Sequence, residues 1–136
     1  MPDVLRADMC YDYNMTRIVI AGGRLEERSA LRVLAQDLQM DVVGEAADWR
    51  TTLAEVALVQ PDVLLVEWDL CLEGGVSALA RLRASCSEEL AIVLVSGFSA
   101  HEQAALSAGA DEFVSRSETA DRVAIRLRKA AAKVRS

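Results

Sequence analysis

Five short runs of apolar, mostly β-branched residues recur along this chain, and helical patterns fill the intervals between them. Runs such as VLLV (63–66) and IVLV (92–95) carry apolar side chains at successive positions, which is typical of strands buried on both faces. Strands that alternate with helices predict a parallel sheet with right-handed crossovers and helices on both faces. The predicted strands are Arg17–Ala21, Asp41–Ala46, Asp62–Glu67, Ala91–Ser96 and Glu112–Ser115.

Four helices are expected between the strands, and a fifth from about Glu118 onward. Asp48 can cap the second helix, Ser99-x-x-Glu102 matches a capping box for the fourth, and Gly109 suits the end of the fourth. The side chains expected to face inward are Leu31, Leu34 and Leu38, then Trp49, Leu53 and Val56, then Val76, Leu79 and Leu82 after Gly74-Gly75, and finally Val123, Leu127 and Val134, with Arg122, Arg126, Lys129 and Lys133 facing outward.

Length and composition limit the class of protein. A chain of 136 residues with 52% hydrophobic content fits one domain, expected at 16–136, after an N-terminal arm (1–15) without sustained periodicity. Acids interrupt that arm, so it is no signal sequence, and no apolar run reaches the roughly 18 residues of a membrane span. We therefore expect a cytoplasmic protein without membrane contact, and the net charge of −6 argues against nucleic acid as a partner of this domain.

Three cysteines are present, and their odd number and lack of metal-ligand spacing suit a reducing compartment. Cys86 is expected in the core because it lies at helical spacing from Leu79 and Leu82. Cys71 is expected in a loop after the third strand, where it is either a reactive thiol or an inert one.

Open parallel sheets bind ligands beyond the carboxyl ends of their strands, at the topological switch point. That rule selects the residues to weigh as a site, which are Gly22 and Gly23, Glu67 to Asp69, Ser96 and Gly97, and Arg116.

Several stretches carry a family resemblance over nearly the whole chain, from Thr16 to about Val134. They read TRIVIAGG, DVVGEAADW, QPDVLLVEWDL, IVLVSG and SAGADEFVSRS. In order and spacing the chain resembles the receiver domain of bacterial response regulators, most closely receivers that precede a helix-turn-helix output domain. The resemblance implies a flavodoxin-like (βα)5 doubly wound α/β fold, with strand order 2-1-3-4-5, and a place in two-component signal transduction.

The resemblance also implies a role for each pocket position. An active receiver carries two acidic residues after the first strand, a phosphoacceptor Asp ending the third, a hydroxyl residue ending the fourth, a switch aromatic in the fifth and a Lys after it. In that order the matching residues here are Gly22 and Gly23, Glu67, Ser96, Phe113 and Arg116.

These differences remove the ligands of a metal ion. Phosphoryl transfer to a carboxylate needs Mg²⁺, which usually takes one or two carboxylates, and glycine offers no side chain. Only Glu67, backbone carbonyls and Asp69 remain, and Glu67 is one methylene longer than Asp. We therefore expect no metal, no cofactor and no catalysis. The chain is predicted to be a degenerate receiver, or pseudo-receiver, that acts by phosphorylation-independent protein–protein interaction.

Two alternatives to this function stay open. The first is a working phosphoacceptor with an atypical pocket, and the second is a small-ligand sensor that uses the vacated crevice near Trp68. A phosphate-cradling role for Gly22-Gly23 is less favoured than a tight turn, because AGGRLEE lacks the G-x-G-x-x-G spacing.

The site residues allow sharper hypotheses. Glu67 either pairs with Arg116 and hydrogen-bonds Ser96, or it is a hydrated charge without a fixed partner. No histidine stands at a suggestive spacing to activate Ser96, and His101 is expected on the surface.

By family resemblance, protein partners or a second copy would dock on the face of the fourth helix, fifth strand and last helix. We expect that face to include His101, Glu102, Phe113 and Arg116 with the basic side of the last helix, and the sequence leaves open whether Phe113 points inward or outward.

Overall fold

The computed structural model describes residues 15–74, 77–85 and 90–135. Most of the predicted arm, together with Cys10, Val76 and Cys86, lies outside the described residues, as do the side chains of Lys133 and Val134. No helix in the described part is long and apolar enough to cross a membrane.

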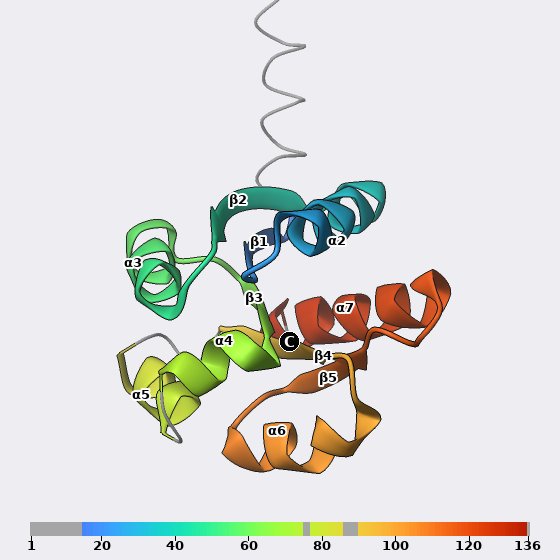
Figure 1. The fold of residues 1–136 in the computed structure, drawn as a ribbon. Coiled ribbons are helices and arrows are strands. Elements are labelled where there is room, and N and C mark those ends of the chain that lie inside the picture. Colours follow the sequence, from blue (N-terminus) through green and yellow to red (C-terminus); the bar gives the residue numbers. More distant parts are fainter. Residues whose placement is uncertain (1–14, 75–76, 86–89, 136) are drawn as a thin grey trace, which may run out of the picture.

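Five parallel strands form one sheet in the order β2-β1-β3-β4-β5, as the sequence predicts (Figure 1). All six residues of β4 and all five of β3 are buried, because helices cover both faces of the sheet. The third strand begins one residue later than expected. The strands are β1 (Arg17–Ala21), β2 (Asp41–Ala46), β3 (Val63–Glu67), β4 (Ala91–Ser96) and β5 (Glu112–Ser115).

The helices divide between the two faces of the sheet (Figure 1). Alternate side chains of each strand point to opposite faces, so Leu64 and Val66 join one core cluster while Val63 and Leu65 join the other. The first cluster lies under α3 to α6, and the second lies under α2 and α7. The helices are α2 (Leu25–Asp37), α3 (Trp49–Val59), α4 (Trp68–Glu73), α5 (Ala78–Ser85), the 3₁₀ turn η1 (Ser99–His101), α6 (Glu102–Ala108) and α7 (Ala120–Arg135).

The predicted helix ends are confirmed at two places and wrong at one. The Asp48 carboxylate accepts a hydrogen bond of 2.7 Å from the Thr51 N–H, and Gly109 ends α6 in a left-handed conformation with φ of 119°. The Ser99–Glu102 capping box is not formed, because η1 tightens the entry to α6 and neither N-cap residue, Phe98 or His101, makes a side-chain capping bond.

Helix α4 follows β3 directly, where the sequence suggested a loop. Its C-terminal end docks on α3: the Trp49 N–H donates to Glu73 at 3.3 Å, and the Trp49 indole lies against Gly74. A Cβ at Gly74 would fall 2.6 Å from the Trp49 Cδ1, so a side chain there would displace the indole. Cys71 is consequently in a buried helix turn. Leu53, expected inward on α3, is 37% exposed.

Candidate functional site

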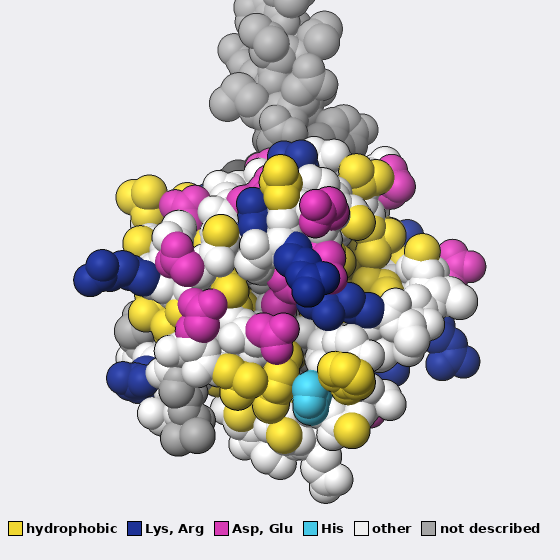
Figure 2. Space-filling model, viewed as in Figure 1, with side chains coloured by type: hydrophobic (Ala, Val, Ile, Leu, Met, Phe, Trp, Pro, Cys, Tyr) yellow, Lys and Arg dark blue, Asp and Glu magenta, His cyan; other side chains and the backbone are white. Residues whose placement is uncertain are grey.

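The carboxyl ends of β1, β3 and β4 meet at one edge of the sheet, so Gly22, Glu67 and Ser96 lie around one location. Arg116 follows β5 and joins them, and its backbone N–H donates to the Ser96 carbonyl at 2.8 Å. Glu67 is the N-cap residue of α4 and is only 5% exposed. Figure 2 shows basic and acidic side chains adjoining at the centre of this face.

Glu67 and Arg116 form an ion pair, so the alternative of an unpartnered, hydrated Glu67 is wrong. Nη2 of Arg116 donates to Oε2 of Glu67 and also lies 3.2 Å from Oε2 of Glu27 on α2. One guanidinium therefore joins the ends of β3 and β5 to α2. The contact with Glu27 was missed from the sequence, because only the packing of α2 brings it to this edge.

Ser96 bonds to His101 rather than to Glu67, which corrects the sequence-based expectation. Its Oγ lies 2.6 Å from the His101 Nδ1 and accepts a 3.1 Å hydrogen bond from the Phe98 N–H. Since that N–H occupies one acceptor direction, the hydroxyl hydrogen can point to the imidazole. The spacing of five residues gave no signal, because η1 folds His101 back over the end of β4.

Aromatic rings hold His101 in this place, so it is half-buried rather than a free surface residue. The Trp68 ring stacks on it at 4.9 Å between centroids and 17° between planes, and the Phe98 ring meets it edge-on at 5.6 Å. Ser96 is only 3% exposed, so a substrate has no approach to its oxygen as a nucleophile.

Gly22 and Gly23 differ in the space around them. A Cβ at Gly22 would fall on the Glu67 carboxylate, 2.7 Å from its Cδ. A Cβ at Gly23 would meet only ordinary contacts, the nearest being the Ala47 carbonyl at 3.9 Å. The Gly22 carbonyl itself accepts a 2.6 Å hydrogen bond from Nη1 of Arg28, a residue that the sequence analysis did not single out.

These residues do not fit a magnesium ion. The Glu67 carboxylate is already paired with Arg116, a second guanidinium occupies the Gly22 carbonyl, and Asp69 is an exposed residue in the first turn of α4. In the described ranges no three His, Cys, Asp or Glu side chains gather as a metal-binding group. Two glycines stand in place of the two acids, and the Arg28 and Arg116 guanidiniums at this edge oppose a divalent ion electrostatically.

Cys71 and Phe113 are both interior residues. Burial raises the pKa of the Cys71 thiol to about 12, so the reactive thiolate is absent at neutral pH and the reactive-thiol alternative is wrong. Phe113 is 3% exposed and belongs to the first core cluster, so its side chain points inward, which the sequence left open.

Comparison with known proteins identifies the family to which the chain belongs. The family model of the response regulator receiver domain matches residues 18–128, which is most of the chain. The chain belongs to this family. It is a receiver domain of two-component signalling, and a search of curated proteins found no match.

Solved receiver structures share the fold. The receiver domain of the putative response regulator NarL from Mycobacterium tuberculosis is 24% identical, with a TM-score of 0.75 over 87% of this chain and 97% of that one. A two-component response regulator of the LuxR family from Aurantimonas sp. is 22% identical, with a TM-score of 0.77 over 88% and 86%. A chain from the R. sphaeroides complex of the CheA3 P1 domain with CheY6 is 20% identical, with a TM-score of 0.74 over 86% and 97%.

Proposed function

We propose that this receiver domain is a pseudo-receiver, which works in the cytoplasm by protein–protein contact without Mg²⁺, phosphorylation or catalysis of its own. The observation that carries this proposal is the ion pair between the buried Glu67 and the partly exposed Arg116, at the strand ends where an active receiver holds its phosphoacceptor. A carboxylate that is already engaged by a guanidinium, with Gly22 and Gly23 opposite, is a poor acceptor for a dianionic phosphoryl group.

The ion pair also supplies a constant signal. Glu67 carries one negative charge, against the −1.5 to −2 of a phosphoryl group, so it mimics phosphorylation only in part. The planar guanidinium suits a carboxylate better than an ammonium does. The ends of β3 and β5 are therefore joined permanently, and we expect one conformation of this edge whether or not a phosphodonor is present.

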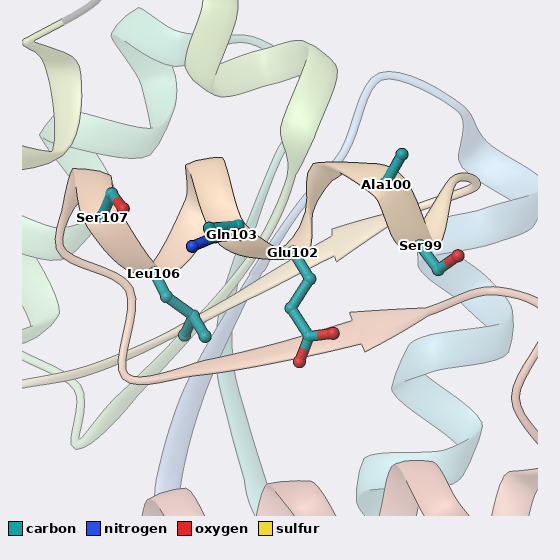
Figure 3. Close-up of a pocket in the computed structure, with 6 residues that line it drawn as sticks. All are labelled: Ser99, Ala100, Glu102, Gln103, Leu106 and Ser107. Carbon is teal, nitrogen blue, oxygen red and sulfur yellow. The ribbon is translucent and has the colours of Figure 1, made fainter.

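The partner surface that we propose is the face of α6, β5 and α7. One shallow depression there is lined by residues of η1 and α6, and Figure 3 shows Glu102 and Leu106 directed from α6 toward β5. Leu106 is 44% exposed, and Ile125 on α7 is 61% exposed. The second depression is lined by Glu112, Glu118, Arg122, Ile125, Arg126 and Lys129.

Charge is divided across this face, because Glu102 lies on the α6 side while Arg122 and Lys129 lie on the α7 side. Such a division suits a protein partner of complementary charge. It also suits a second copy related by a two-fold axis, because the acidic side of one copy would then face the basic side of the other. The CheA3–CheY6 complex among the structural relatives is a case in which a protein domain is the partner.

Intact mass spectrometry tests the proposal. The protein is incubated with Mg²⁺ and a small phosphodonor such as acetyl phosphate, and its mass is compared with that of an untreated sample. We expect no added phosphoryl group. A gain of one phosphoryl group that disappears in Glu67→Gln would overturn the proposal and establish the phosphoacceptor alternative.

A further inference from the structure

Glu67 and Gly22 compete for the same space. The Glu67 side chain reaches back across the sheet edge, and a Cβ built on Gly22 would lie 2.7 Å from its Cδ and 3.1 Å from its Cγ. Contacts under 3.0 Å require an atom to move, and Glu67 cannot swing away freely because it is buried and paired with Arg116. The backbone of Gly22 is not left-handed, so glycine is needed here for space and not for conformation.

Gly23 provides a matched comparison one residue further on. Its backbone conformation is also one that residues with a side chain can adopt. An added Cβ would lie 3.9 Å from the Ala47 carbonyl and 4.0 Å from the Leu70 Cδ1. Position 23 can therefore accept a side chain, whereas position 22 cannot while residue 67 is glutamate. The two glycines are neighbours in sequence and yet face different constraints.

We infer that the residue types at positions 22 and 67 depend on each other. The position of a divalent cation is then closed for two reasons: the acidic ligands are missing, and the Glu67 side chain fills the space. The carboxylate of Glu67 fills the volume that an acidic side chain at position 22 would need. An acid at position 22 and a glutamate at position 67 thus exclude one another. Cation binding returns only when residue 67 is shortened together with the introduction of acids at positions 22 and 23.

This inference deepens the proposed function, because it identifies what keeps a cation out of the same site. It is tested by variants at positions 22, 23 and 67, whereas the proposed function is tested by phosphodonor treatment of the unaltered protein. The two can therefore fail separately.

A thermal-unfolding cycle tests the steric part. Gly22→Ala adds one methyl group and no charge, and we expect it to lower Tm, whereas the control Gly23→Ala leaves Tm unchanged or raises it. In a Glu67→Ala background the Gly22→Ala penalty should disappear. If Gly22→Ala does not fold alone, recovery of folding in the Glu67→Ala background gives the same answer. Equal effects of Gly22→Ala in both backgrounds would overturn the inference.

Isothermal titration with Mg²⁺ tests the cation part, using two variants that carry the same number of carboxylates. The triple variant Gly22→Asp, Gly23→Asp, Glu67→Asp should bind Mg²⁺ saturably. The double variant Gly22→Asp, Gly23→Asp, which retains Glu67, differs from it by one methylene and should bind at least tenfold more weakly or fail to fold. Equal binding by both variants, or no binding by the triple variant, would refute the blocked site.

Discussion

At the scale of single residues, the arrangement around Arg116 decides the chemistry of the sheet edge. Glu67 has a side chain only 6% exposed, whereas the Arg116 side chain is 34% exposed and also contacts Glu27. A buried carboxylate without a partner is costly, while a partly exposed pair contributes little beyond balancing that cost. The guanidinium is therefore needed chiefly because Glu67 is buried.

Removing Arg116 should accordingly destabilise the domain more than removing its second contact. Arg116→Ala is expected to lower the free energy of unfolding by about 1–2 kcal/mol, because Glu67 would stay buried without a counter-charge. The control Glu27→Gln should change it by no more than about 0.5 kcal/mol. Urea unfolding measures both, and equal losses would show that Glu67 is not the group that Arg116 compensates.

Cys71 should be protected from thiol reagents in the folded protein. Burial raises its pKa to about 12, so almost no thiolate exists at pH 8. In a Cys10→Ser, Cys86→Ser background, labelling by a disulfide reagent should be slow until the protein is unfolded. Labelling of the folded protein at the rate of a free peptide thiol would contradict the buried position in α4.

The raised pKa of Cys71 also makes the stability of the fold depend on pH. The pKa of the folded thiol lies above its ordinary value of 9.0. Because only the unfolded chain ionises between about pH 9 and pH 12, this group's contribution to stability is complete below pH 9 and is lost as the pH rises toward 12.

At the scale of elements, helices α3 and α6 both end at a residue in the left-handed conformation, but the residue type differs between them. Helix α6 ends at Gly109 with φ of 119°, and α3 ends at Gln60 with φ of 46°. Glycine adopts a left-handed conformation without strain, whereas a residue with a Cβ pays about 1 kcal/mol or more. The end of α3 is therefore strained and the end of α6 is not.

Substitutions at these two ends should have opposite signs. Gly109→Ala is expected to lower stability by about 1 kcal/mol, since space is available at the nearest contact of 4.0 Å and only the backbone is strained. Gln60→Gly should raise stability by about 0.5 kcal/mol, the relief of strain exceeding the added freedom of the unfolded chain. Chemical denaturation provides both values.

Ala54→Gly, in the middle of α3, is the control for Gln60→Gly. It should cost about 1 kcal/mol, because helix interiors disfavour glycine. A loss of stability at Gln60→Gly as large as at Ala54→Gly would mean that the end of α3 is unstrained in solution.

At the scale of the whole molecule, the apolar residues fall into two groups, those in the core and those on the surface. The core clusters on the two sides of the sheet hold the fold, and exposed apolar side chains on α6 and α7 are available for a partner. Leu106 and Ile125 contribute little to the core at 44% and 61% exposure. Their substitution should therefore affect binding and not folding.

Charge introduced on the proposed docking face should weaken self-association or partner binding. Ile125→Asp is expected to reduce dimer formation at least tenfold, measured by sedimentation equilibrium, with Tm nearly unchanged. Val33→Asp on α2, which is 55% exposed on another face, is the matched control and should leave association intact. If both variants associate like the unaltered protein, the face of α6, β5 and α7 is not a homodimer interface.

Much of the fold was predictable because its signals are local or periodic. Buried strands are apolar at successive positions, and four of the five strands begin and end where the sequence indicates. The cap at Asp48 and the turn at Gly109 likewise follow from single residues. Helix α4 was missed because a six-residue helix has no room for a periodic pattern and takes its support from packing on Trp49.

The amino-acid sequence by itself determined the alternation of strands and helices, and it removed the acidic pair, because a glycine has no side chain in any fold. Tertiary structure alone decided which groups meet at the sheet edge. It placed Arg116 between Glu67 and Glu27, joined Ser96 to His101 through a 3₁₀ turn, and set Glu67 into the space beside Gly22. Such contacts depend on where separate strands and helices end in space, and a local pattern in the sequence cannot predict those positions.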